Sequence, residues 1–197
     1  MAIHYSCLKS SLLTPYIHAL ADLRLRVFRD YPYLYDGSLS DELEYLEAYS
    51  NSPSSLVTLA LDGNVVIGAS TCLRLSDADE GFRACFENNG TEISKICYLG
   101  ESVLLKPYRG RGIGKMFFHY RENHARSLQC SSAAFCSVDR GADHAHKPID
   151  YRPLDGFWET QGYEKHPKLK AHFSWKEVHE DKATPKTLTF WTKALTA

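Results

Sequence analysis

Glycines and basic residues gather in one short stretch of the chain, Arg109-Gly110-Arg111-Gly112-Ile113-Gly114-Lys115. An apolar segment precedes this stretch, and a segment with helical periodicity follows it directly. Glycine lets backbone N–H groups approach a ligand closely, and the first turn of a helix leaves four N–H groups without internal partners. Because the helix dipole also favours negative charge there, the stretch predicts a phosphate-binding turn.

The charge of the chain supports a local anion site. The 197 residues carry 23 Lys and Arg against 24 Asp and Glu, a net charge of -1. Between Lys106 and Arg126, in contrast, Glu122 is the single acidic residue among six basic ones. This balance argues against a general nucleic-acid binder, which needs a broad cationic face.

Two common phosphate-binding classes do not fit the spacing. A P-loop needs G-x-x-x-x-G-K-[ST], but Met116 follows Gly114-Lys115, so no hydroxyl is placed to hold magnesium. A dinucleotide fingerprint needs G-x-G-x-x-G in a first βαβ unit, whereas these glycines are spaced at twos and come after two expected helices and two expected strands. A nucleotide triphosphatase and a nicotinamide or flavin enzyme are therefore disfavoured.

The stretch resembles the acyl-CoA-binding segment of the GNAT N-acetyltransferase superfamily. The family signature [Q/R]-x-x-G-x-[G/A] is met by Arg109, Gly112 and Gly114, and the order of elements over nearly the whole chain is also similar. The resemblance implies acetyl-CoA as the donor and no metal. It also implies that the loop holds the pyrophosphate of coenzyme A and that the preceding strand pairs with pantetheine. The residues concerned are Arg109, Gly110, Arg111, Gly112, Ile113, Gly114 and Lys115 for the pyrophosphate, and Ser102, Val103 and Leu104 for pantetheine.

A thioester is already activated, so such an enzyme needs mainly to position an amine and to remove its proton. Glu101 is the only acidic residue in the apolar segment Ile96 to Leu105, and GNAT enzymes frequently carry a glutamate on this strand. We expect Glu101 to be the general base, acting directly or through water. The alternative is a glutamate that only hydrogen-bonds neighbouring backbone or Ser102.

The residue that protonates the departing thiolate is left open. Many family members use a tyrosine in a pattern like L-Y-E-x-x-G-F, and Trp158 occupies that position here. An indole cannot act as this acid. Tyr151, Tyr163 or the ammonium product are the remaining candidates.

Three further groups have weaker claims. Tyr31, Tyr33 and Tyr35, with Phe28, follow the first helix and either line an acceptor pocket or pack as a loop. Cys136 has no evident activating base, which favours a structural thiol over a nucleophile. Zinc ligands could come from Asp143, His144 and His146 with Cys136 or Asp139, but a histidine-rich loop needs no metal.

The elements that must position these residues read as one mixed α/β domain over 1–197. We expect a central, mostly antiparallel sheet with a splayed parallel strand pair, flanked by helices. The expected helices run from a cap at Thr14 with Pro15 to Tyr31-Pro32, from a cap at Ser40 to Asn51, and over 112–128 and 154–161, with a helical turn at 82–86. The expected strands are 56–61, 65–73, 96–105, 133–138, 171–178 and 188–195.

The sequence therefore favours an acetyl-CoA-dependent N-acetyltransferase that acts on a primary amine by direct attack in a ternary complex. A small-molecule acceptor is preferred over a protein, and a homodimer is possible. Two alternatives stay open, a non-catalytic acyl-CoA sensor and a transferase that uses another acyl donor. No apolar run approaches the roughly 18 residues of a membrane span, and the N-terminus has neither a basic region nor an apolar stretch long enough for a signal peptide. The six cysteines have no CxxC pairing. A cytoplasmic protein with mostly buried thiols is expected.

Overall fold

The structure is a computed structural model that describes residues 2–88 and 90–196. Within these residues one eight-stranded sheet has the order β1-β2-β3-β4-β6-β8-β7, and β5 lies beside β3. The strands are β1 (Ile3–Leu8), β2 (Leu56–Asp62), β3 (Val65–Arg74), β4 (Ile96–Tyr98), β5 (Ser102–Leu104), β6 (Ser132–Val138), β7 (Glu164–Trp175) and β8 (Thr184–Ala194). All neighbours pair antiparallel except β4 and β6, which are parallel. The predicted fold class is confirmed.

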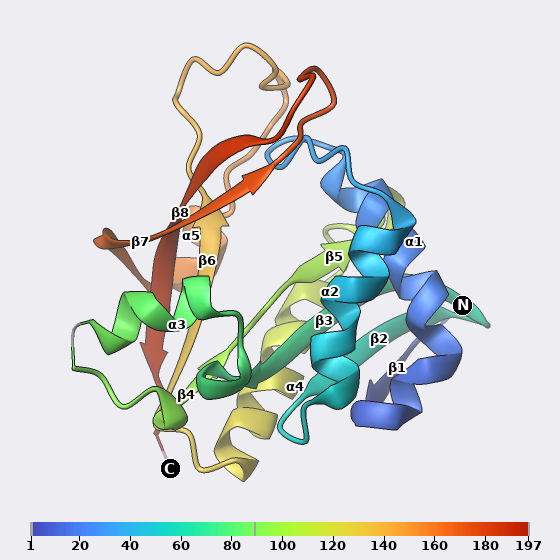
Figure 1. The fold of residues 1–197 in the computed structure, drawn as a ribbon. Coiled ribbons are helices and arrows are strands. Elements are labelled where there is room, and N and C mark those ends of the chain that lie inside the picture. The colour runs from blue at the N-terminus through green and yellow to red at the C-terminus, as the bar shows by residue number, and fades with distance from the viewer. Residues whose placement is uncertain (1, 89, 197) are drawn as a thin grey trace.

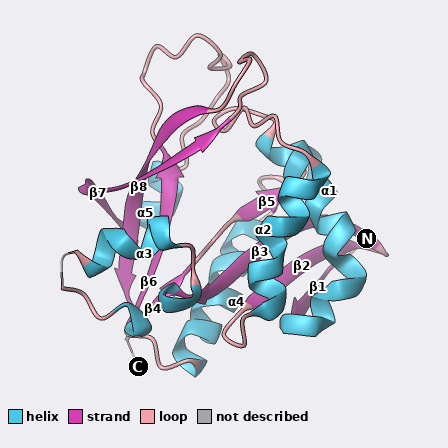
Figure 2. Cartoon of the chain, viewed as in Figure 1, coloured by secondary structure: helices cyan, strands magenta, loops and turns pink. Residues whose placement is uncertain are grey.

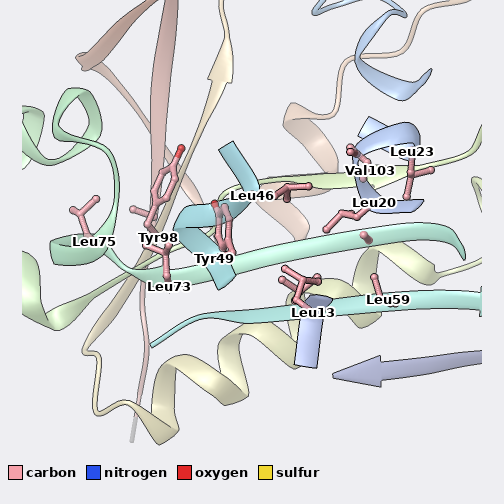
Figure 3. Packing of buried hydrophobic residues seen from close by; sticks show 14 of the residues in the cluster. Leu13, Leu20, Leu23, Leu46, Tyr49, Leu59, Leu73, Leu75, Tyr98 and Val103 are labelled. Carbon is pink, nitrogen blue, oxygen red and sulfur yellow. The ribbon is translucent and has the colours of Figure 1, made fainter. Parts of the chain in front are cut away.

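Helices cover both faces of the sheet (Figure 1). They are α1 (Ile17–Phe28), α2 (Leu39–Asn51), α3 (Glu80–Glu87), α4 (Ile113–Ser127) and α5 (Asp155–Thr160). Leu20 of α1 and Leu46 of α2 are fully buried against strands β2 and β3. Figure 3 shows this packing around Leu13, Leu59 and Val103. Phe117 of α4 packs with Ile67 in a separate cluster, so α4 closes the opposite face of these strands.

Two predicted helix starts are wrong. Ser38, not Ser40, caps α2, because its hydroxyl accepts from the Asp41 N–H while the Asp41 carboxylate accepts from the Ser38 N–H. This reciprocal pair satisfies two amides that a cap at Ser40 would leave open. Thr14 and Pro15 belong to a preceding 3-10 turn, Ser10–Tyr16, and α1 begins only at Ile17.

The predicted single strand over 96–105 is also wrong. It is divided into β4 and β5 by Leu99, Gly100 and Glu101. At Gly100 a Cβ atom would lie 2.0 Å from the Tyr49 hydroxyl oxygen, so the close approach of α2 requires glycine at this point. The two strands remain in line because β3 pairs with both of them.

The N-terminal and C-terminal strands depart from the sequence expectation in extent. Strand β1 was not expected, although it pairs with β2 along its whole length. Strand β7 starts at Glu164, seven residues before the predicted 171, and a register shift between His166 and Lys170 breaks its alternation. A bulge of this kind hides a strand from a period-two search.

Three loops meet at one end of the molecule (Figure 2). Arg140 ties them together: its guanidinium donates to the carbonyls of Pro32 and Tyr33, at 2.6 and 3.1 Å, and forms an ion pair with Glu177 at 2.6 Å. The loop that follows α1 is thereby fixed to the turn between β7 and β8. In the described part of the chain, no helix combines the length and the apolar character needed to cross a bilayer.

Candidate active site

The glycine-rich turn leads into the N-terminus of α4. Gly110 and Gly112 have φ of 77° and 82°, a region that other residues rarely adopt, and Gly112 is the N-cap of the helix. A Cβ atom at either glycine would meet nothing within 4 Å, so the space beside both is open. The first turn of α4 contains no acidic residue, while Arg109, Arg111 and Lys115 lie around it, largely exposed. This geometry suits a phosphate group, and it brings the predicted residues 109–115 into one turn.

Strand β5, before this turn, pairs with another described strand on one side only, and on its other side the Leu104 carbonyl accepts from Arg109 Nε at 3.2 Å. The Thr71 N–H donates to the Glu101 carbonyl, and the Leu105 N–H donates to the Ile67 carbonyl. Along an antiparallel strand the backbone groups of alternate residues point in opposite directions, so those of Ser102 and Leu104 point away from β3. No other described strand pairs with β5 there.

The parallel pair opens beside this edge. Strands β4 and β6 pair from Ile96 with Ser132 to Tyr98 with Ala134, and the Leu99 N–H still donates to the Ala134 carbonyl at 2.8 Å. Beyond that point β6 continues with β8 as its partner, whereas β5 follows β3. The free side of β5 therefore lies where the sheet opens between β5 and β6.

Glu101 lies in the break between β4 and β5, and it is 7% exposed. Its Oε1 atom is 2.7 Å from a guanidinium nitrogen of Arg24, although the angle is poor for a hydrogen bond. Its Oε2 atom accepts from the Tyr45 hydroxyl at 2.9 Å. The carboxylate is therefore held from two helices, α1 and α2.

Arg24 is shared by two carboxylates, Glu101 and Glu42, and its guanidinium also lies 4.0 Å from the centroid of the Tyr45 ring. Burial lowers the pKa of Arg24, but the charges of Glu101, Tyr45 and Glu42 raise it by more, so the net direction is upward. Arg24 is thus a permanent cation in this cluster. Removing one partner of such a buried ion pair strongly destabilises the folded protein, because the other charge stays buried without a partner.

Tyrosine hydroxyls line up beside the cluster. The Tyr45 and Tyr49 hydroxyls are 3.0 Å apart, and the Tyr98 hydroxyl is 3.5 Å from the Cys136 sulfur. Burial raises the pKa of all three tyrosines, so they stay protonated in the physiological range. In Figure 3 the hydroxyl ends of Tyr49 and Tyr98 point the same way from the sheet.

A groove of about 460 Å³ opens on the side of these tyrosines, between α2 and the start of α3. Its walls combine aromatic rings and carboxylates, and in the part of the chain that the structure describes no Lys, Arg or His lines it. The lining residues are Asp41, Glu44, Tyr45, Ala48, Tyr49, Leu73, Asp77, Ala78, Asp79, Phe82 and Tyr98.

The three tyrosines predicted near the acceptor separate into two environments. The Tyr33 hydroxyl is buried, and its pKa is raised by burial and by Cys136 and Glu101 against the opposing charge of Arg24. Tyr35 has a pKa raised to about 12, by burial first and then by the charges of Glu42 and Asp41. Tyr31 instead packs edge-on against Tyr151 at 4.6 Å between ring centroids. Tyr33 and Tyr35 therefore border the charged cluster, and Tyr31 does not.

The candidates for the thiolate acid have different surroundings. Trp158 packs on Phe135 and Trp191, with ring centroids 5.2 and 5.1 Å away. The Tyr163 hydroxyl is buried and donates to Glu122 at 3.2 Å, and burial and the Glu122 charge raise its pKa strongly. Tyr151 is half-buried, and its pKa is also raised, first by burial.

The cysteines and histidines differ in burial and contacts, and none of the described ones forms a metal-binding group. Cys136 is partly buried, and burial raises the pKa of its thiol to about 12. Cys72, Cys97 and Cys130 are buried as expected, whereas Cys7 is exposed. Among residues 2–88 and 90–196, no group of three or more His, Cys, Asp or Glu side chains could hold a metal ion. His146 instead stacks on His179, at 3.8 Å between ring centroids.

Sequence reasoning missed most of the cluster around Glu101. Glu42, Tyr45 and Tyr49 recur at helical spacing, and this pattern indicates that the three side chains share one face of α2. Arg24 interrupts the apolar face of α1, which is a second signal, because a charge on a buried face needs a partner. The partners themselves come from three distant segments.

Comparisons with known proteins assign the chain to a family and show a shared fold. The family model described as "Acetyltransferase (GNAT) family" matches residues 18–148. A GNAT-family acetyltransferase from Staphylococcus aureus Mu50 has a similar structure, with a TM-score of 0.60, 16% identity and coverage of 99% of this chain and 100% of that one. No curated protein matches the chain by sequence.

Two further solved structures are similar. The ribosomal-protein-alanine N-acetyltransferase of Brucella melitensis has a TM-score of 0.61 and 16% identity, and the match covers 99% of this chain and 100% of that one. The YncA protein of Salmonella typhimurium, solved with its cofactor acetyl-CoA, has a TM-score of 0.62 and 12% identity, with coverage of 100% and 95%. At these identities the likeness concerns the fold.

Proposed function

Because the chain belongs to the GNAT acetyltransferase family, we propose that it transfers an acetyl group from acetyl-CoA to a primary amine, with residues 1–197 acting as one domain. The observation that carries the proposal is the open edge of β5, which runs from Glu101 directly toward the glycine turn at the N-terminus of α4. One extended ligand with a phosphate end and a reactive end fits both features. Acetyl-CoA supplies the activated acyl group.

The chain's own residues divide the binding between them. The backbone groups of Ser102 and Leu104 pair with the pantetheine amides as a neighbouring strand would, with Val103 holding β5 on β3. The N–H groups around Gly110, Gly112, Ile113 and Gly114 hold the pyrophosphate, because the first turn of α4 leaves them free for a ligand. Arg109, Arg111 and Lys115 add positive charge around this turn.

Glu101 is the general base in this proposal, and Tyr45 connects it to the groove. Tyr45 is part of the groove wall, and its hydroxyl donates to Glu101 Oε2. Its oxygen can accept a proton from an incoming ammonium while its own proton moves to Glu101, so the buried carboxylate need not touch the acceptor. The neutral amine nitrogen then bonds to the acyl carbon and the carbon–sulfur bond breaks. The nitrogen loses its second proton as the amide forms, which balances the proton that the thiolate takes up.

Two measurements test the proposal. Binding of a ligand at 100 times its dissociation constant contributes about 2.7 kcal/mol, which raises Tm by roughly 5–10 °C for a chain of this size. We expect this shift with acetyl-CoA and coenzyme A but not with ATP or NAD. Amine-dependent thiol release from acetyl-CoA should follow.

Each contrary result has a distinct meaning. A larger shift with ATP or NAD would overturn the assignment of the glycine turn. A shift with acetyl-CoA without thiol release across amines would favour an acyl-CoA sensor, a function that Trp158 in the usual tyrosine position also favours. Faster release with a longer acyl chain would identify another donor.

A further inference from the structure

The groove beside Tyr45 is lined by carboxylates and aromatic rings, which favour a cationic ligand. We propose that the acceptor is a small molecule with two or more ammonium groups joined by an alkyl chain. This inference rests on the proposed function, since it names the acceptor class for the same site. One amine would react beside Tyr45, and a second ammonium would be held at the rim.

Four carboxylates line the groove without a basic partner. Asp41, Glu44, Asp77 and Asp79 come from two separate segments, and in the described part of the chain no ion pair joins any of them to Lys, Arg or His. Carboxylates of one sign along a groove give it a negative potential, which attracts cationic ligands. The groove is thus acidic on a chain whose total charge is only -1.

Three of these carboxylates also have structural roles that keep them in place. Asp77 accepts from the hydroxyls of Ser52, at 2.8 Å, and Ser54. Asp79 caps α3 by accepting from the Gly81 N–H at 2.7 Å. The pKa of Asp41 is lowered by its hydrogen bonds from the Ser38 backbone and side chain, so it stays ionised. Glu44 is exposed on α2 and has no such role.

Aromatic rings form the rest of the wall. The rings of Phe82 and Tyr98 lie 4.6 Å apart, and those of Tyr45 and Tyr49 lie 5.6 Å apart. The faces of aromatic rings attract ammonium groups, and their apolar surface also suits an alkyl chain. A carboxylate rim over an aromatic wall therefore matches an alkyl diamine better than a neutral or anionic amine.

The groove also reaches the reacting end of the site. Tyr45 is part of its wall and is hydrogen-bonded to Glu101, the proposed base. A volume of about 460 Å³ lies within the range of roughly 300–1,000 Å³ usual for small-molecule sites. A diamine would lose two protons at the reacting nitrogen, one before the attack and one as the amide forms, and it would keep its second ammonium at the rim.

The test uses three probes that differ at one end only: butylamine, 1,4-diaminobutane and 4-aminobutanoate. We expect kcat/KM to be highest for the diamine and lowest for the amino acid, whose carboxylate meets the acidic rim. The double variant Glu44→Gln, Asp79→Asn should reduce the diamine-to-butylamine ratio roughly twofold to fivefold for each carboxylate. Asparagine still caps a helix, so α3 is retained.

Glu47→Gln is the matched control, because Glu47 is also exposed on α2 but does not line the groove. It should leave the ratio unchanged. Equal use of butylamine and the diamine, or an equal loss of the ratio in the control, would overturn the inference and leave the proposed function standing. A basic peptide preferred over the diamine would also overturn it.

A binding readout separates the two proposals. Titration of 1,4-diaminobutane into the protein loaded with coenzyme A measures the groove without turnover. Diamine binding that is tighter than butylamine binding and weakened by the double variant, with no thiol release, would support the acidic groove and count against the transferase. Absence of that preference would overturn the inference, whatever the activity.

Discussion

The Tyr45 hydroxyl donates to the carboxylate of Glu101 at 2.9 Å, and this bond joins the wall of the groove to a buried acid. Tyr45 belongs to α2, whereas Glu101 lies in the break between β4 and β5. The proposed proton path thus joins a helix and a strand break that are 56 residues apart. The following predictions test its parts.

Glu101→Gln should lower kcat about 10²- to 10⁴-fold, because a general base contributes an effect of this size. The amide keeps the shape of the side chain but cannot take up the proton. Affinity for acetyl-CoA, measured by calorimetry, should stay nearly the same because the proposed coenzyme contacts lie in β5 and the glycine turn. Unaltered turnover would eliminate Glu101 as the base.

Tyr45→Phe should reduce kcat at least tenfold with a smaller change in KM, because the ring stays in the groove while the hydroxyl link to Glu101 is lost. Lost stability should be about 0.5–1.5 kcal/mol, the usual contribution of one hydrogen bond. Tyr49→Phe is the comparison, since it leaves the contact between Tyr45 and Glu101 intact. If both variants lose the same share of kcat, Tyr45 has no special position in the path.

Gly112→Ala should weaken acetyl-CoA binding at least tenfold. Alanine at a φ of 82° is strained by roughly 1–2 kcal/mol, and its methyl group would fill the open space beside the turn. Gly141→Ala is the control, because a Cβ atom there also meets nothing within 4 Å but no unusual φ is required. Calorimetric titration of both variants with acetyl-CoA checks this, and equal affinities would remove Gly112 from the site.

His124 should make folding stability depend on pH near neutrality. Burial lowers its pKa below 6.5, and its Nε2–H donates to the Ser54 carbonyl at 2.9 Å. Because the unfolded chain binds the proton more readily, this contribution is fully present above pH 6.5 and is lost as the pH falls from there toward the lower folded pKa.

Denaturant unfolding between pH 8 and pH 5 measures this dependence. His124→Gln keeps an N–H donor but does not titrate, so its stability should change less over this range. His18→Gln, at an exposed site on α1, should behave as the parent protein does. A parent slope that persists in His124→Gln would assign the pH dependence to other groups.

Local patterns in the sequence predicted the parts of the fold that depend on nearest neighbours. The glycine of Asp62-Gly63 takes a positive φ, as the predicted turn between β2 and β3 requires, and α4 follows the glycine turn as its periodicity indicates. The break at Gly100 could not be predicted in this way. It depends on the Tyr49 hydroxyl, which comes from helix α2, about a quarter of the chain away in sequence.

The candidate site shows the same division. The residues of the glycine turn are consecutive, so one motif predicted them together. The cluster of Arg24, Glu42 and Glu101 joins three segments, and a buried charge in a sequence does not name its partner. Side-chain chemistry indicated that partners must exist, and only tertiary packing determined which ones.

The side of β5 that pairs with no other described strand affects the tendency of the protein to aggregate when no coenzyme A is bound. A bare strand edge is a template on which another chain can add, and it is a common start of aggregation. A ligand that lies along β5 as an extra strand removes that hazard, and it also favours the native state by mass action. The concentration of coenzyme A would then affect how long the folded protein persists as well as its rate of acetyl transfer.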